Sequence, residues 1–237
     1  GNIWDRMLGH LVAGGNGATN STSSNMVDYG WKRHAGFDVV AYTGSGSADF
    51  VYHSLGRIPE MIWVKKSDGT GNWPVYHKSL GLSNDPFDYL LELNDTASQI
   101  DEATMWNDAA PEKNRFTVGT HTDVNANGSV YVAMLFASVN GISKVGSFTG
   151  NGTSQSISLG FQPRFLILKN ATSTEKWYVV DTVRGWSGSG DKYISLNTDY
   201  AEANGTFGEP TATGFDISGS DNWNNANGET FIYYAHA

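Results

Sequence analysis

Short apolar segments separated by turn residues are the main pattern along this chain. The clearest are Met61–Val64, Tyr131–Phe136, Phe165–Leu168 and Phe231–Tyr234, and such aromatic and β-branched runs predict β-strands. Asn-Gly pairs supply the positive φ angles that tight hairpins need, and they begin at residues 16, 127, 140, 151, 204 and 227. Only residues 95–105 suggest a helical turn, so the pattern predicts an all-β protein.

The segments recur in the same order in the two halves of the chain. Tyr42–Ser47 returns as Phe148–Thr153, and Leu55–Lys65 returns as Leu159–Lys169. Further along, Asn125-Ala-Asn-Gly128 returns as Asn225-Ala-Asn-Gly228. We therefore predict two tandem antiparallel β-sandwich repeats, jelly-roll-like, at residues 37–140 and 141–237. Residues 1–36 carry a weaker echo, which predicts a partial repeat or connector; an unrelated linker is the alternative.

Composition removes several classes of protein. The 237 residues include no cysteine, which excludes a disulfide scaffold, a Cys-zinc site and a thiol nucleophile. The chain has 15 Lys and Arg against 24 Asp and Glu, so it lacks the basic character of a nucleic-acid binder. No apolar run approaches the roughly 20 residues of a membrane span. Aromatics reach 13% of the residues, too many for a disordered chain.

No catalytic motif is recognisable, which predicts a protein that is not an enzyme and needs no cofactor. Acid pairs such as Asp101/Glu102, Asp108/Glu112 and Glu92/Asp95 keep a glycosidase open as a minor alternative. The six histidines are scattered singly, so no metal site is expected. A weak calcium candidate is the loop with Asp123, Asn125 and Asn127, which lacks the closing Glu of a calcium loop.

Two copies in one chain separate shared scaffold from specific surface. Positions alike in both copies, such as Trp73 and Trp177, are predicted to be core. The segments that differ lie at 98–115, 185–191, 204–214 and 219–224. Their tryptophans have no aromatic counterpart and lie among polar residues, so they are candidates for stacking on a sugar. The candidate contacts with a glycan or receptor are Trp106, Asp108, Trp186, Asn222 and Trp223; burial against another repeat or subunit is the alternative.

A family resemblance rests on four of these segments. They are Phe37–Gly44, His53–Val64, Ile142–Gly152 and the terminal strand that follows an Asn-x-Asn-Gly turn. They resemble repeats of an uncharacterised domain family in bacteriophage tail fibres and other virion proteins, from phages of marine and freshwater bacteria including cyanobacteria. The resemblance covers about residues 29–237.

The resemblance implies a virion protein of the phage tail, assembled in the bacterial cytoplasm, where the lack of cysteine is no disadvantage. It also implies a homotrimer, with other virion tail proteins and a host surface glycan or similar receptor as partners. The expected function is a non-enzymatic tail-fibre or receptor-binding segment, without nucleic-acid binding or membrane insertion. The alternatives are a purely architectural virion part, or a carbohydrate-binding module of a secreted bacterial enzyme.

Overall fold

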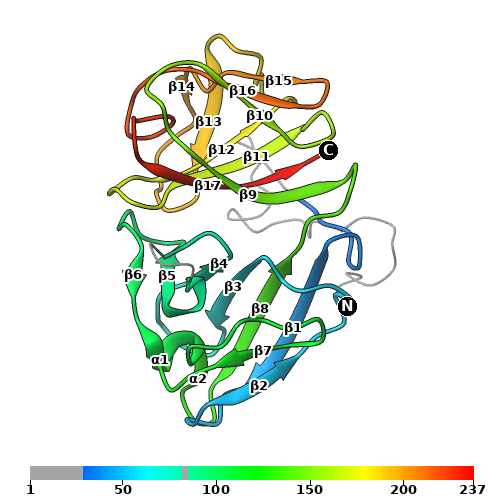
Figure 1. Ribbon diagram of the computed structural model, residues 1–237. Coiled ribbons are helices and arrows are strands. Elements are labelled where there is room, and N and C mark those ends of the chain that lie inside the picture. Colours follow the sequence, from blue (N-terminus) through cyan, green and yellow to red (C-terminus); the bar gives the residue numbers. More distant parts are fainter. Residues whose placement is uncertain (1–28, 82–84) are drawn as a thin grey trace, which may run out of the picture.

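The computed structural model describes residues 29–81 and 85–237, which form an almost entirely β architecture (Figure 1). This confirms the all-β prediction. The echo expected around Trp4–Gly9 lies outside the described residues. The first repeat consists of β1 (Phe37–Thr43), β2 (Asp49–Tyr52), β3 (Met61–Lys66), β4 (Pro74–His77), the 3-10 helix η1 (Pro86–Asp88), β5 (Tyr89–Glu92), β6 (Ile100–Asp101), α1 (Ala103–Trp106), β7 (Arg115–Val118), α2 (Thr122–Asn125) and β8 (Val130–Phe136).

The second repeat contains the remaining strands and no helix among the described residues. They are β9 (Ser143–Thr149), β10 (Gln155–Ser158), β11 (Phe165–Asn170), β12 (Trp177–Asp181), β13 (Asp191–Ser195), β14 (Ala203–Gly205), β15 (Glu209–Thr211), β16 (Gly214–Ile217) and β17 (Thr230–His236). The large sheets have the orders β1-β8-β3-β4-β5-β6 and β9-β17-β11-β12-β13-β14. The small sheets are β2-β7 and β10-β16-β15. Every strand pair in these sheets lies within one repeat.

The two copies share their pairing register as well as their strand order. Phe37 pairs with Phe136 in the first large sheet, and the residues at the same places in the second, Ser143 and His236, also pair. The small sheets agree in the same way: Val51 pairs with Phe116, and Ile157 pairs with Phe215. Strand β15 has no counterpart in the first repeat, where α1 lies in the corresponding stretch of chain.

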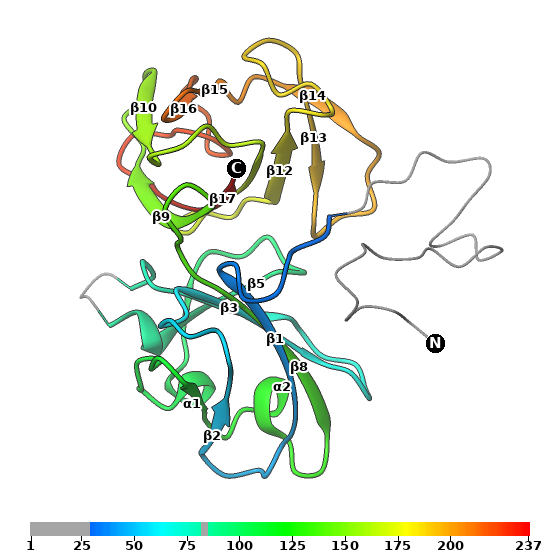
Figure 2. The ribbon, with the colours of Figure 1, turned by 90° about the vertical axis from the view of Figure 1, so that its right-hand side faces the viewer.

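The sheets form successive layers, with the two large sheets inside and the two small sheets outside (Figures 1 and 2). Alternation along β3 explains the layering. Ile62 and Val64 point into the core of the first repeat, whereas Met61 and Trp63 point into a core between the repeats. Because both faces of β3 are buried, its sequence is a continuous apolar run rather than an alternating one.

The repeats are joined by a full hydrophobic core. Met61, Trp63 and Phe136 face Phe165 and Ile167 across it. Phe165 and Ile167 occupy the places on β11 that Met61 and Trp63 occupy on β3, so the same face of each repeat is buried, as in a self-complementary dimer interface. Backbone hydrogen bonds also cross the interface. The amide of Gln99 donates to the carbonyl of Ala171, and the amide of Glu175 donates to the carbonyl of Thr96.

One turn is built identically in both repeats. A Cβ on Gly44 would lie 2.3 Å from the carbonyl oxygen of Ala126, and one on Gly150 would lie 2.1 Å from that of Ala226. Only glycine allows this approach. The recurring Asn-x-Asn-Gly segment therefore does more than form a hairpin turn, because it packs directly against the chain that leaves β1 or β9.

Candidate functional site

Trp106 and Trp186 are anchors of the cores rather than surface platforms. Trp106 and Trp186 are each only 2% exposed. The indole of Trp106 donates a 3.1 Å hydrogen bond to the carbonyl of Tyr89, and that of Trp186 packs 6.1 Å from the ring of Phe215. The expectation that these two rings stack on a ligand is wrong for this structure, because neither ring has a free face.

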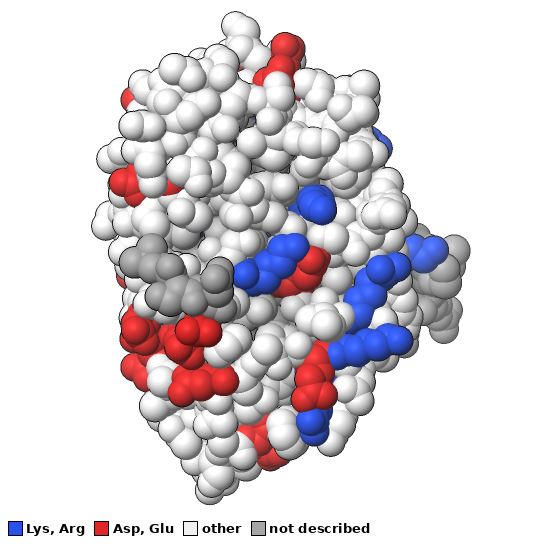
Figure 3. Space-filling view, in the orientation of Figure 1, with Lys and Arg blue, Asp and Glu red and all other residues white. Residues whose placement is uncertain are grey.

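The other predicted contact residues are scattered. Trp223 is half-buried, with its ring centroid 4.5 Å from that of Phe207. Asn222 is exposed beside it. Asp108 is exposed in the first repeat. Its carboxylate lies next to that of Asp88, whose pKa is raised by the partial burial of Asp88 and by Asp108. Acidic side chains gather over this part of the first repeat, near β6 and α1 (Figure 3). The predicted residues therefore do not form one site.

The calcium candidates are not available as a ligand set. Asn125 is buried, and its amide nitrogen donates 2.6 Å hydrogen bonds to the carbonyls of Ser47 and Gly119. Its side-chain oxygen accepts a 2.7 Å bond from the amide of Ser45. Asp123 is half-buried and Asn127 is exposed. Because Asn125 joins two loops of its own repeat, one with Ser45 and Ser47 and one with Gly119, the calcium expectation is not supported, and the residue is a structural clasp.

A different surface carries exposed aromatic side chains. In the outer strand β2, Val51 points into the core, so Phe50 and Tyr52 point outward and are 47% and 64% exposed. On the paired strand β7, Arg115 lies opposite Tyr52, and its guanidinium carbon is 3.9 Å from the centre of the Phe50 ring. We call Phe50, Tyr52, Glu112 and Arg115 the outer platform.

Hydrogen bonds hold the platform's cation in place. Arg115 donates from Nε and Nη2 to one carboxylate oxygen of Glu112, at 2.9 and 2.7 Å. The ring of His53 lies 3.2 Å from the carbonyl of Glu112, which extends the platform past the end of β2. This guanidinium stacked on a ring presents flat apolar surface together with polar groups, a combination suited to a sugar or to a protein side chain.

The second repeat lacks this surface. Ser156 and Ser158 occupy the places of Phe50 and Tyr52, because Ile157 pairs with Phe215 as Val51 pairs with Phe116. The outer platform is therefore a specific addition to a shared scaffold. A sequence signal for it exists in the alternation of Asp49-Phe50-Val51-Tyr52 against Gln155-Ser156-Ile157-Ser158, once the two strands are aligned.

The acidic and histidine side chains that could hold a metal ion are dispersed over the part of the chain that the structure describes. Residues 29–81 and 85–237 contain no group of three acidic or histidine side chains placed to hold a metal ion. The predicted acid pairs serve local structure: Glu102 caps α1 at Thr104, and Asp95 accepts from the amide of Ala97. No helix in these residues is long and apolar enough to cross a membrane.

Comparisons place the chain in a family without assigning an activity. Neither the curated proteins nor the solved structures contain a match to it. A family model does match, over residues 8–237, and so covers both repeats and most of the segment before them. The chain belongs to the family described as a domain of unknown function, DUF7483.

Proposed function

We propose that this chain is a non-enzymatic receptor-binding segment of a bacteriophage tail fibre, which contacts a host-surface glycan or similar receptor through the outer platform. The observation that carries the proposal is the exposure of Phe50 and Tyr52 beside Arg115, at positions where the other repeat has serine. Two exposed aromatic side chains on one strand form a contiguous apolar patch, and such a patch marks an interaction site more often than a single exposed ring does.

The position of the platform supports this function. It lies on the outer side of β2 and β7, away from the core that joins the repeats (Figure 1). A ligand can therefore bind there without disturbing the packing between the repeats. The rigid β scaffold and the ion pair between Glu112 and Arg115 preorganise its side chains. The low charged content, 16% of residues, fits a contact made by ring stacking and neutral hydrogen bonds.

Two substitutions that copy the second repeat test the proposal. The fluorescently labelled chain is incubated with a panel of bacterial cells and with immobilised envelope polysaccharides. We expect binding to a subset of them, and at least tenfold weaker binding by Phe50→Ser and Tyr52→Ser. Tyr200→Ser is the matched control, because Tyr200 is 69% exposed but lies in the other repeat. Equal binding by all variants contradicts the role of the platform.

The architectural alternative has a specific observation in its favour. Tyr and Arg are enriched at the centres of protein–protein contacts, so the platform also suits a neighbouring virion protein. The solution mass of the chain addresses the tail-fibre assignment: a homotrimer is expected, and a monomer at high concentration counts against it. Release of reducing sugar from envelope polysaccharide would contradict the non-enzymatic assignment.

A further inference from the structure

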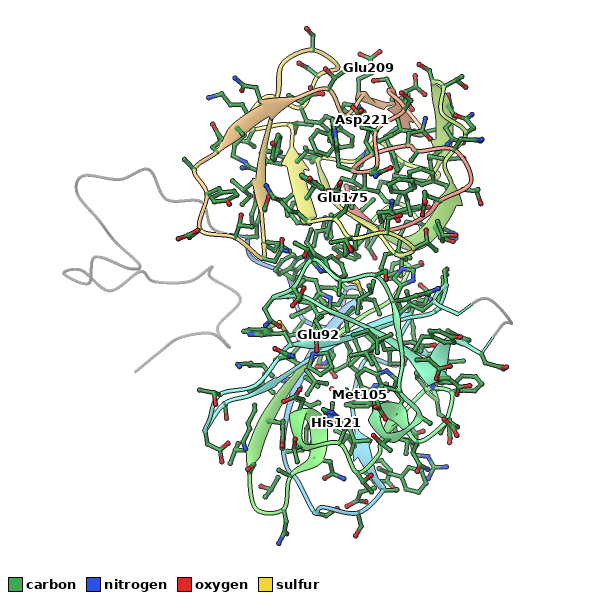
Figure 4. The ribbon with its side chains drawn as sticks, turned by 90° about the vertical axis from the view of Figure 1, so that its left-hand side faces the viewer. Glu92, Met105, His121, Glu175, Glu209 and Asp221 are labelled. Atoms are coloured by element: carbon green, nitrogen blue, oxygen red, sulfur yellow. The ribbon has the colours of Figure 1, made fainter. Side chains whose placement is uncertain are left out.

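The second repeat has a groove on its own outer face, and two of its walls, the loop 187–189 and β15, belong to segments that differ from the first repeat. It has a volume of about 400 Å³ and lies between the loop 187–189, the start of β15 and the strands β10 and β16. We call it the serine groove and define it by Ser154, Ser156, Ser187, Ser189, Glu209 and Asp216. In Figure 4, Glu209 lies at the end of the second repeat that is remote from the first.

A buried carboxylate holds two walls of the groove in place. Asp191 is fully buried, and one of its oxygens accepts 2.9 Å hydrogen bonds from the amides of Ser187 and Gly188. Its other oxygen accepts a 2.8 Å bond from the amide of Phe207, next to the wall that carries Glu209. Trp186, buried beneath, anchors the same loop. The groove is therefore preformed, which lowers the cost of ordering it around a ligand.

The two acidic side chains of the groove lie side by side. Glu209 and Asp216 are direct partners in the β15–β16 ladder, so their side chains lie on the same face. No cationic side chain lines the groove, and neither acid forms an ion pair with the described residues. Asp216 accepts one hydrogen bond, from the hydroxyl of Ser156. The remaining carboxylate oxygens can accept hydrogen bonds from a ligand.

We propose that the serine groove binds a neutral saccharide, whose hydroxyls donate to Glu209 and Asp216 and accept from the serine hydroxyls. A ligand rich in donors suits paired carboxylates, whereas an acidic sugar would add a third negative charge to the groove. This inference goes beyond the proposed function, since it assigns a second site of different chemistry. It does not depend on binding at the outer platform.

The whole chain is titrated against an array of neutral, amino and acidic saccharides. We expect binding to neutral saccharides and not to acidic ones, and about tenfold weaker binding by each of Glu209→Gln and Asp216→Asn. Asp199→Asn, an exposed acid outside the groove, is the matched control and keeps full affinity. Glu209→Gln removes charge without removing any bond that the fold uses, so its melting temperature should be unchanged.

Three results would overturn the assignment. They are unchanged affinity in both groove variants, binding confined to acidic or to amino saccharides, and calcium binding that Glu209→Gln abolishes in the absence of saccharide. Failure of the groove and failure of the platform are distinguishable. Phe50→Ser and Tyr52→Ser should leave neutral saccharide binding at the groove intact, and Glu209→Gln should leave cell binding by the platform intact.

Discussion

The indole Nε1 of Trp177, in the second repeat, donates a 2.9 Å hydrogen bond to the backbone carbonyl of Glu92, in the first. The ring is 1% exposed, so the bond is shielded from water. The counterpart in the first repeat, Trp73, is half-buried and lies 5.5 Å from the ammonium of Lys65. Both rings pack against the core between the repeats, but of these two indoles only that of Trp177 donates a hydrogen bond to the other repeat, so two residues that look equivalent in the sequence make different contributions.

Replacing Trp177 should weaken the whole molecule. Trp177→Phe removes the bond to Glu92 and leaves a small cavity, which should cost about 2–4 kcal/mol of unfolding free energy. Trp73→Phe should cost less than about 1 kcal/mol, since that ring already meets solvent. Urea unfolding followed by tryptophan fluorescence and circular dichroism measures both. An equal loss in the two variants would contradict the role of Trp177 in joining the repeats.

The glycines after β1 and β9 should tolerate no side chain. In Gly44→Ala and Gly150→Ala the new methyl group would overlap the carbonyl oxygens of Ala126 and Ala226, so each variant should lose roughly 1–3 kcal/mol or more. Gly30→Ala is the control, since nothing lies within 4 Å of its Cβ position and its φ is not positive. Thermal melting compares the three variants. Unchanged melting of Gly44→Ala would show that the turn relaxes.

Much of the scaffold was predictable because its strand segments occur twice in the sequence. The apolar runs at Met61–Val64 and Phe165–Leu168 are β3 and β11, at matching places in their sheets. The packing of one repeat against the other could not be predicted from these segments. A strand that is buried on both faces shows one continuous apolar run, and that run does not say whether the second face meets the same repeat, the other repeat or another chain.

The site was harder to predict than the fold, for a physical reason. Trp106 and Trp186 lie among polar residues in the sequence, but residues distant in the chain bury them, such as Tyr76 beside Trp106. Local composition does not report such long-range contacts. The segments 98–115, 185–191 and 204–214 do supply walls of the outer platform and the serine groove. Their polar residues, rather than their tryptophans, face the solvent.

The buried Asn125 should not tolerate even a conservative substitution. Asn125→Asp replaces an amide that donates to two carbonyls with a carboxylate that repels them, so we expect a loss of about 3 kcal/mol or more. The same change in the second repeat, Asn225→Asp, should act alike, because the Asn225 amide also donates to the carbonyl of Gly219. Asn127→Asp, at an exposed position, is the control.

Calcium should leave the melting temperature of the wild-type chain unchanged, because the Asn125 side chain is buried and its oxygen already accepts a hydrogen bond from the amide of Ser45. Differential scanning calorimetry with millimolar calcium or with EDTA measures this. A rise in melting temperature with calcium that Asp123→Asn abolishes would restore the calcium site.

A buried histidine should make the fold sensitive to mild acid. His77, at the end of β4, is fully buried, and its Nδ1 accepts a 3.1 Å hydrogen bond from the amide of Ser79. Burial, reinforced by the nearby Lys78 ammonium and opposed by the Tyr233 backbone and by Glu60, lowers the pKa of His77 to about 3. The unfolded chain takes up a proton near pH 6.5 and the folded chain does not. Stability is therefore complete above pH 6.5 and falls as the pH drops towards 3.

Between pH 7 and pH 5 this difference should cost about 2 kcal/mol of unfolding free energy. Carboxylates with lowered pKa, such as Asp38 and Asp181, lose their contribution only at lower pH. The raised pKa values of Asp88 and Glu92 act in the opposite direction to the histidine, so the difference between the wild-type chain and His77→Gln is what isolates His77. Urea unfolding at several pH values should show a flatter dependence in His77→Gln. His53→Gln should flatten it less, because burial also lowers the pKa of His53 but that side chain is only half-buried. The same pH dependence in the wild-type chain and in His77→Gln would mean that His77 is protonated as readily in the folded state as in the unfolded one.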